Sequence, residues 1–221
     1  MPLQLRLEMT ESSRSFHRKL AGALSPLLTE ALLRAAPEVK DKSKQIMRRA
    51  LFFSDEYISL VGGQLRGELG IPNAPATVLS LIEKIVNKID VEVKRARRQG
   101  ESLRGTLNVI LTNKSVLDLS NEPETKYITD KGLEINWYNW LTFRGEDTII
   151  RGYDAVFADF SSQPFSRSGL GLMYPGEAKM WHVPRAFRGS LNDNWISRAI
   201  SRELDALDKA VEGIILKELK R

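Results

Sequence analysis

The chain has no cysteine among its 221 residues, which excludes disulfide bonds, thiolate catalysis and cysteine-ligated metals. It has only two histidines. His17 lies in a polar segment and is expected to be solvated. His182 lies among apolar residues and is expected to pack in a strand rather than serve as a ligand or general base. We therefore expect no catalytic residue, no metal site and no cofactor.

Long apolar runs and a large excess of one charge are absent as well. No segment approaches the about 18 continuous apolar residues that a membrane span needs. Residues 1–8 lack the basic segment and apolar run of a signal peptide. The 33 Lys and Arg residues outnumber the 28 Asp and Glu residues by only five, and the two signs are interspersed. This pattern predicts a protein made in the cytosol, with no membrane partner and little general affinity for nucleic acid.

The residues that are present suit a packed globular protein, since 42% of them are hydrophobic. No repeat and no low-complexity linker divides the chain, so we expect a single α+β domain over residues 1–221. Residues 1–24 are expected to form an N-terminal arm and residues 192–221 a C-terminal docking helix. Apolar residues of the arm alternate with polar ones, as in a short strand: Leu3, Leu5, Leu7 and Met9.

Apolar residues at three- and four-residue spacing predict helices in the first third of the chain. Residues 25–51 follow this spacing, but Pro37 interrupts it, so the segment is either two consecutive helices or one kinked helix. Residues 52–70 mix apolar residues with glycines. A long structureless loop would be unusual there, so some part is expected to be a short helix or strand.

Two further helices are expected to begin at capping residues. Asn73 is expected to cap a helix over residues 73–89, because a side-chain oxygen at this position can accept from the first free backbone N–H groups. Asn192 or Asp193 is expected to cap the amphipathic helix of residues 193–219 in the same way. The apolar stripe of that last helix must be buried against a sheet or another subunit.

The middle of the chain shows two-residue periodicity, which is typical of strands. The β-branched or aromatic runs are residues 91–94, 106–111, 135–143 and 149–160. Gly145 lies in a link short enough for a hairpin between the last two runs. We therefore expect a central antiparallel sheet between the N-terminal helices and the C-terminal helix. Aromatic residues at alternating positions in the third run are expected to face a core on one side and a partner on the other: Trp137, Tyr138 and Trp140.

One motif indicates a different class of function. Glu177-Ala178-Lys179, with Asp159 before it, resembles the residues of metal-dependent nucleases of the restriction-endonuclease type. In such a site two carboxylates hold the cation while the lysine orients water or stabilises negative charge. The motif follows Pro175-Gly176, which predicts a solvated turn instead of a buried strand. A metal-dependent nuclease or nucleic-acid-binding factor using Asp159, Glu177 and Lys179 is therefore the alternative interpretation.

Basic clusters and glycine pairs offer weaker signals. Residues 94–98 read Lys-Arg-Ala-Arg-Arg and could contact phosphate, although flanking glutamates favour a solvated hairpin end. Gly62-Gly63 and Gly169-Leu170-Gly171 lack the spacing of phosphate-binding loops, and tight turns explain them better.

The last quarter of the chain carries a resemblance to a family. The segments are Ser166 to Met173, Trp181-His182-Val183-Pro184 and Asn192 to Ile200, and together they resemble the C-terminal pattern of tailed-bacteriophage neck, minor tail and tail-completion proteins. Gly63 to Leu69 is similar to the Gly-x-Leu-Arg turn that precedes the sheet in that family. The helix expected over residues 73–89 departs from the family pattern, which has a strand there.

The resemblance implies a non-enzymatic virion protein that forms a homo-oligomeric ring at the head-tail joint or the tail end. Its partners would be other copies of itself, adjacent phage neck or tail proteins and DNA passing through the channel, and it would be assembled in the host cytoplasm. Exposed apolar residues in loops often mark interfaces. The residues expected to make assembly contacts are Leu3, Leu5, Leu7, Trp181, Pro184, Phe187, Trp195 and Ile196.

Overall fold

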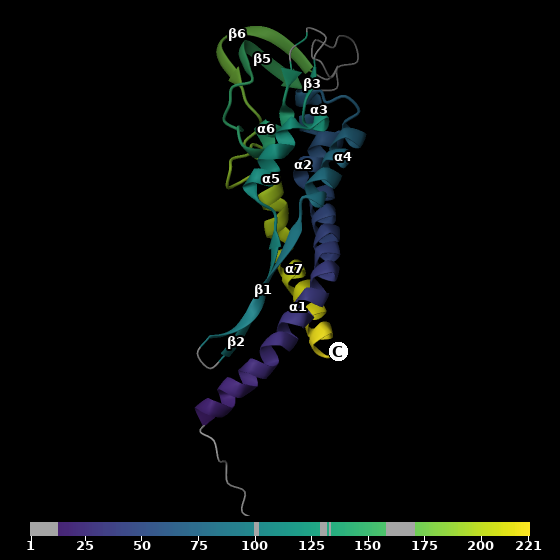
Figure 1. Cartoon of the computed structure of the whole chain (residues 1–221). Coiled ribbons are helices and arrows are strands. Elements are labelled where there is room, and N and C mark those ends of the chain that lie inside the picture. Colours follow the sequence, from purple (N-terminus) through teal and green to yellow (C-terminus); the bar gives the residue numbers. More distant parts are fainter. Residues whose placement is uncertain (1–12, 100–101, 129–131, 133, 158–170) are drawn as a thin grey trace, which may run out of the picture. The chain divides into compact units, whose positions relative to one another are not determined.

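The computed structural model describes residues 13–99, 102–128, 132, 134–157 and 171–221, and within them it confirms an α+β protein dominated by helices (Figure 1). The helices are α1 (Ser13–Phe52), α2 (Asp55–Gly62), α3 (Gln64–Leu69), α4 (Ala74–Asn87), α5 (Asn113–Asp118), α6 (Trp137–Thr142) and α7 (Trp195–Leu219), with the 3-10 turns η1 (Leu119–Asn121) and η2 (Pro123–Thr125). The strands are β1 (Asp90–Gln99), β2 (Ser102–Ile110), β3 (Tyr127–Ile128), β4 (Glu134–Ile135), β5 (Ile150–Phe157) and β6 (Gly171–Trp181).

The first helix is continuous through both of its prolines, Pro26 and Pro37. Of the two alternatives for residues 25–51, two consecutive helices are therefore wrong. Each proline removes one backbone hydrogen bond from the helix. The second half of the expected arm over residues 1–24 is helical, because α1 begins at Ser13, and its role as an arm stays a prediction.

The chain divides into two compact units, and α1 and α7 each contribute residues to both. Unit 1 contains residues 1–41, 90–110 and 209–221. Its core is small and lies where α1, the β1–β2 hairpin and the end of α7 meet. Buried Ala35, Val39 and Ile214 form the centre, and partly buried apolar residues pack around them: Val91, Leu107, Val109, Val211 and Ile215. The expectation of a single domain over residues 1–221 stays a prediction.

Unit 2 contains residues 42–89 and 111–208 and has the larger core. Large apolar residues of α1, of α4, of the short helices and of α7 are fully buried in it: Leu51, Leu60, Leu65, Leu81, Ile82, Ile85, Leu119, Trp137, Tyr138, Leu141 and Trp195. Burial of so many large apolar side chains stabilises this unit most, since each contributes about 1.5–3 kcal/mol relative to exposure.

The strand predicted over residues 135–143 is wrong, since α6 occupies most of it. The Asn136 side chain accepts a hydrogen bond from the Asn139 backbone N–H and caps this helix. The neighbours Trp137 and Tyr138 are both fully buried, whereas a one-sided strand would bury only one of two adjacent side chains. The predicted core-and-partner alternation of these aromatics is therefore wrong.

The predicted hairpin through Gly145 is also wrong, because β5 pairs with β6 and not with residues 135–143. The strands of the described residues form three separate antiparallel pairs, β1–β2, β3–β4 and β5–β6, in place of one central sheet.

The capping predictions for the two later helices fail for different reasons. Asn73 adopts a left-handed conformation, with φ of 46° and ψ of 46°, and its side chain makes no cap hydrogen bond. The cap of α7 is Asn194, one residue later than predicted, whose Oδ1 accepts from the backbone N–H groups of Ile196 and Ser197. The helices themselves are confirmed, with α4 at Ala74–Asn87 and α7 at Trp195–Leu219.

Glu68 of α3 is a buried carboxyl group in unit 2. Its Oε1 accepts a hydrogen bond from Gln64 Nε2, and its buried Oε2 has no partner within the described structure. Burial raises the pKa of Glu68 from 4.5 to about 7, against the opposing effect of the Gln64 hydrogen bond. The folded state therefore binds more protons than the unfolded state between these two pH values, and the free energy of unfolding falls as the pH rises through this window.

Replacing Glu68 with glutamine should remove this pH dependence. The variant is expected to be more stable than the parent at pH 8, by up to about 3 kcal/mol, and equally stable at pH 4, where Glu68 is protonated in both states. Urea denaturation at the two pH values measures the difference. Glu83→Gln is the matched control, because Arg48 lowers the pKa of Glu83 and its loss should destabilise the protein at pH 8. If Glu68→Gln changed the free energy of unfolding equally at pH 4 and pH 8, Glu68 would not have the raised pKa described above.

Candidate assembly surface

An exposed apolar stripe lies on the part of α1 that belongs to unit 1. Phe16, Leu20, Leu24 and Leu27 follow one another at spacings of four, four and three residues, which places them along one side of the helix. Their exposed fractions are 51%, 44%, 43% and 60%. Exposed leucines scattered singly are ordinary, but a contiguous row is typical of a surface that contacts another molecule.

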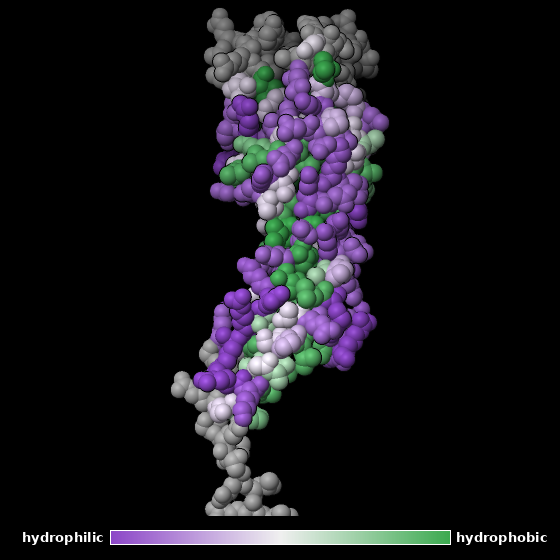
Figure 2. Space-filling view, in the orientation of Figure 1, coloured by the Kyte–Doolittle hydropathy of each residue, from purple (hydrophilic) through white to green (hydrophobic). Residues whose placement is uncertain are grey.

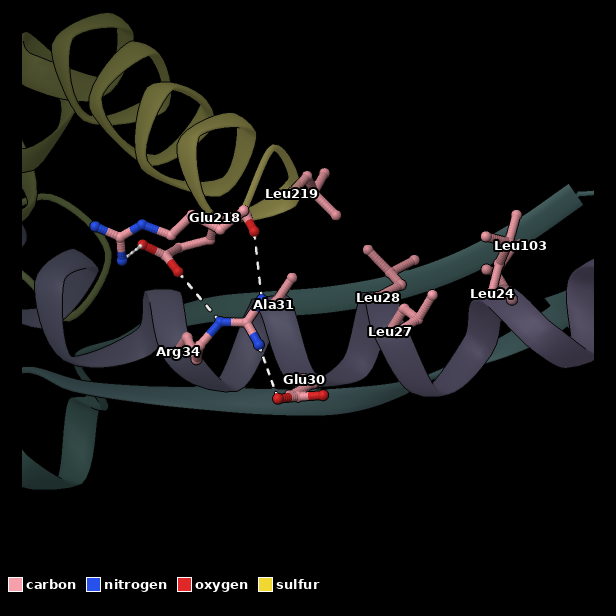
Figure 3. Close-up of a pocket in the computed structure, with 10 residues that line it drawn as sticks. Leu24, Leu27, Leu28, Glu30, Ala31, Arg34, Leu103, Glu218 and Leu219 are labelled. Carbon is pink, nitrogen blue, oxygen red and sulfur yellow. Dashed lines mark hydrogen bonds and ion pairs between the residues drawn. The ribbon is translucent and has the colours of Figure 1, made fainter.

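The stripe leads into an apolar groove of unit 1. Figure 3 shows Leu24, Leu27 and Leu28 of α1 facing the same space as Leu103 of β2 and Leu219 of α7. The groove has a volume of about 550 Å³, which lies within the range of about 300–1,000 Å³ that is usual for binding pockets. Space of this size with leucine walls fits apolar side chains of a partner.

Charged residues close one end of the groove. Arg34 Nε donates to Glu218 Oε2 at 3.2 Å, and Arg34 Nη1 forms an ion pair with Glu30 at 2.8 Å (Figure 3). Glu218 also pairs with Arg221 at 2.6 Å, and only 3% of its side chain is exposed. Because a buried carboxylate needs such partners, this cluster fixes the end of α7 against α1 and keeps the groove open beside it.

Figure 2 shows how this part of the surface is divided, with apolar residues over the α1 segment beside a hydrophilic hairpin. The apolar side is the candidate assembly surface, which we define as Phe16, Leu20, Leu24, Leu27, Leu28, Leu103 and Leu219.

None of the interface residues predicted from the sequence is among the residues that define this surface. Leu3, Leu5 and Leu7 are outside the described residues, and Trp181 ends β6 with a side chain that is also outside the description. Pro184 and Phe187 are half-buried in the loop before α7. Trp195 is fully buried and Ile196 is 2% exposed. Neither of these last two side chains therefore offers surface to a partner in this conformation.

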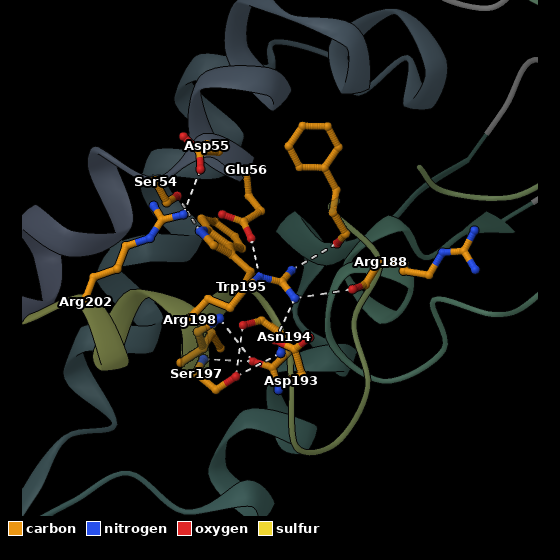
Figure 4. A network of polar contacts seen from close by, with 12 residues as sticks. Ser54, Asp55, Glu56, Arg188, Asp193, Asn194, Trp195, Ser197, Arg198 and Arg202 are labelled. Carbon is orange, nitrogen blue, oxygen red and sulfur yellow. Dashed lines mark hydrogen bonds and ion pairs between the residues drawn. The ribbon is translucent and has the colours of Figure 1, made fainter. Parts of the chain in front are cut away.

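Trp195 instead joins elements of unit 2 (Figure 4). Its indole N–H donates to Ser54 Oγ at 2.7 Å, and the same oxygen accepts from the Tyr57 backbone N–H at the start of α2. A single buried hydroxyl thus connects α1, α2 and α7. This geometry assigns Trp195 to packing within the chain.

Arg198, one turn further along α7, organises the loop before it. Its guanidinium donates to Glu56 at 2.8 Å and to Asp193 at 2.9 Å, and it also reaches the backbone carbonyl groups of Phe187 and Arg188 (Figure 4). Glu56 is only 2% exposed, so Arg198 compensates a buried charge. The loop that carries Pro184 and Phe187 is therefore held by hydrogen bonds to α7.

The residues of the alternative nuclease interpretation are not brought into a described site. Asp159 lies outside the described residues. Glu177 and Lys179 lie within the span of β6, between Pro175 and Met180, where the register with β5 shifts and residues 176–179 are left out of the pairing. Searched over the described residues, the structure has no group of three or more His, Asp or Glu side chains that could hold a metal ion. No helix in the described part of the chain is long and apolar enough to cross a membrane.

His182 follows β6 and is half-buried, and its Nδ1 lies 3.2 Å from the backbone carbonyl oxygen of Asp147. This contact to a main-chain group assigns His182 to packing at the end of β6.

Sequence reasoning missed the apolar stripe because it followed only the buried face of the same helix. Of the predicted row, Ala31, Leu32 and Ala35 are buried in the core, while Leu28 lines the groove, and the adjacent row of Leu20, Leu24 and Leu27 has the same helical spacing. Two neighbouring apolar rows on one helix are the signal that could have revealed a second contact surface.

Comparisons with protein-family models, with curated proteins and with solved structures find no match for this chain.

Proposed function

We propose that the protein is a non-enzymatic assembly protein of a bacteriophage neck or tail, which forms a ring of identical subunits. The observation that carries the proposal is the exposed leucine surface of α1 and its groove, since an apolar surface of this kind is stabilised when another chain covers it. The phage assignment rests on the sequence resemblance of the last quarter of the chain.

We propose that residues 1–12 of a neighbouring copy, which lie outside the described part of the chain, supply the apolar side chains that enter this groove. Alternate residues of any extended segment share one side, so Leu3, Leu5 and Leu7 would do so if they dock in extended form, over about 13 Å at about 3.3 Å per residue. The α1 wall of the groove from Leu24 to Arg34 spans about 15 Å at about 1.5 Å per residue. Three leucines at this spacing match the length of the apolar wall.

This arrangement predicts rings in preference to two-fold dimers. The donated segment and the receiving groove are different surfaces, so each copy can give to one neighbour and receive from another. Such head-to-tail contacts close into rings when the rotation between copies is a simple fraction of a turn.

Replacing Leu27 with aspartate should separate the subunits. The full chain is expected to elute with a mass that is a multiple of 25.0 kDa, and the variant as a monomer, because a carboxylate would be buried without a partner in the groove. Size-exclusion chromatography with light scattering measures the mass, and negative-stain imaging shows whether the assembly is a ring.

Leu33→Asp is the matched control. Leu33 is 57% exposed on the same helix but does not line the groove, so this variant should keep the parental mass. A parent chain that is a monomer would contradict the proposal. Magnesium-dependent DNA cleavage that is lost in Glu177→Ala would favour the nuclease alternative instead.

A further inference from the structure

The basic cluster of residues 94–98 lies in a β-bulge of the β1–β2 hairpin. Lys94 pairs with Thr106 and Arg97 with Arg104, so Arg95 and Ala96 together face the single residue Gly105. A bulge shifts the alternation of side chains along its strand. In a regular strand, Arg97 would lie on the opposite face from Lys94, because their positions differ by an odd number.

Because of this shift, the small residue Ala96 packs toward α1 and the cationic side chains are exposed to solvent. Ala96 is 4% exposed, whereas Lys94, Arg95 and Arg97 are exposed on either side of it. Arg104, opposite Arg97 on β2, is exposed as well. The pairing places Lys94, Arg97 and Arg104 on the outer face of the two-stranded ribbon, and Arg95 is exposed in the bulge beside them. We call Lys94, Arg95, Arg97 and Arg104 the basic face.

Helix α1 fixes the bulge from the other side. Ser25 Oγ donates to the Ala96 carbonyl oxygen at 2.6 Å, and the Ala96 N–H donates to Thr29 Oγ1 at 3.0 Å. A Cβ atom on Gly105 would come within 2.6 Å of Leu32 Cδ1, so glycine lets α1 approach the ribbon here without a shift of the Leu32 side chain. The ribbon is thus held with its inner face covered and its basic face available.

The described strands β1 and β2 provide no ion pair to the basic face. Among the described residues, Lys94, Arg95 and Arg97 form no ion pair, and Arg104 contacts only the Gln99 side-chain oxygen, at 3.5 Å. Arg97 and Arg104 are directly opposite each other, an arrangement that is unfavourable for like charges. An anion bound between them would relieve this repulsion, so the face is suited to a polyanion.

We propose that the basic face binds the phosphate backbone of double-stranded DNA. A two-stranded ribbon is narrow enough to enter the major groove, which is about 12 Å wide. Arginine side chains at its exposed face can each donate two parallel hydrogen bonds to a phosphate. The acidic residues of the same strand, Asp90 and Glu92, lie toward the opposite end of the ribbon, so the charge is concentrated near the turn.

Duplex DNA is a better candidate than an acidic protein, because it offers a regular row of negative charges, with one per about 1.7 Å of helix axis. This inference does not depend on ring assembly, since the basic face belongs to a single copy. It concerns backbone contacts, and therefore binding without preference for sequence.

The salt dependence of binding to a random-sequence 30-base-pair duplex tests the proposal on the full-length protein. Four phosphate contacts predict a slope of about −3.6 for the logarithm of the association constant against the logarithm of salt concentration, or an affinity loss of about 100-fold between 50 and 200 mM salt. Arg97→Gln with Arg104→Gln should reduce the slope to about −1.8 and the loss to about tenfold. Fluorescence anisotropy measures both.

Lys209→Gln with Lys220→Gln is the control with the same change of net charge, because both lysines are exposed and neither belongs to the hairpin: Lys209 lies within α7 and Lys220 directly after it. This variant should keep the parental slope. An unchanged slope in Arg97→Gln/Arg104→Gln, an equal loss in the control, or tighter binding to anionic lipid vesicles than to the duplex would each overturn the proposal. Circular dichroism should show both variants folded, since the removed side chains are exposed.

Discussion

Replacing Trp195 with alanine is expected to lower the free energy of unfolding by about 3–5 kcal/mol, the usual cost of deleting a buried tryptophan side chain. Trp195 is fully buried, and its indole N–H is the partner of Ser54 Oγ at 2.7 Å. The variant would lose both the packing of the ring and this hydrogen bond between α7 and the start of α2. Urea denaturation followed by circular dichroism measures the change.

Phe53→Ala is the matched control for removal of an aromatic side chain. Phe53 is 66% exposed, so its loss should change the free energy of unfolding by less than about 1 kcal/mol. If Trp195→Ala instead reduced the oligomeric mass while leaving stability unchanged, Trp195 would be an interface residue, and its assignment to the core of unit 2 would be incorrect.

Gly189→Ala is expected to have an even larger effect, above about 4 kcal/mol, because the clash is with backbone atoms that cannot move away. A Cβ atom on Gly189 would lie 2.1 Å from the Leu141 carbonyl oxygen and 2.5 Å from the Thr142 nitrogen. Gly189 also donates to the Trp140 carbonyl oxygen at 3.0 Å and accepts from Gly145 at 2.9 Å. The loop before α7 therefore contacts the end of α6 through main-chain atoms alone.

Gly213→Ala is the matched control, because the same substitution is expected to raise the free energy of unfolding there and not to lower it. Gly213 lies within α7, and a Cβ atom there would meet nothing within 4 Å. Alanine is favoured over glycine in a helix interior by about 0.5–1 kcal/mol, so this variant should be slightly more stable than the parent. A Gly189→Ala protein as stable as Gly213→Ala would show that the two segments do not approach as closely as described.

The parts of the fold that could be predicted from the sequence are those with a local signal. The helices α4 and α7 bury apolar residues at regular helical spacing over several turns, and this spacing predicted both. The hairpin of β1 and β2 followed from two β-branched runs separated by turn residues. In each case a single segment contains all the information needed.

The errors arise where tertiary contacts override a local preference. The aromatic run at Trp137 and Tyr138 favours a strand by composition, but both side chains can be buried in unit 2 only if the segment turns into a helix. The pairing of β5 with β6 joins segments that are separated by residues 158–170 in the sequence, and no turn signal indicated it. Local propensity contains no information about such partners.

The candidate surfaces were only partly predictable for the same reason. The groove combines Leu27 of α1, Leu103 of β2 and Leu219 of α7, which lie far apart in the sequence. The basic residues of the hairpin were recognised, but flanking glutamates favoured a solvated end. The bulge that turns the cations to one face depends on the register Lys94 to Thr106 and Arg97 to Arg104, which a sequence pattern does not contain.

Assembly through the donated segment is tested most directly by a disulfide between two copies, which the absence of native cysteine makes possible. One copy carries Leu5→Cys and the other Leu27→Cys, with tags of different length, and the mixture is oxidised under mild conditions. The account predicts a mixed cross-linked species, since a docked segment brings the Cα atoms within the about 4.4–6.8 Å that a disulfide needs. Leu33→Cys is the control, because Leu33 does not line the groove, and its mixture with the Leu5→Cys copy should give no mixed cross-linked species. A mixture of Leu5→Cys and Leu27→Cys copies without the mixed species would contradict the account.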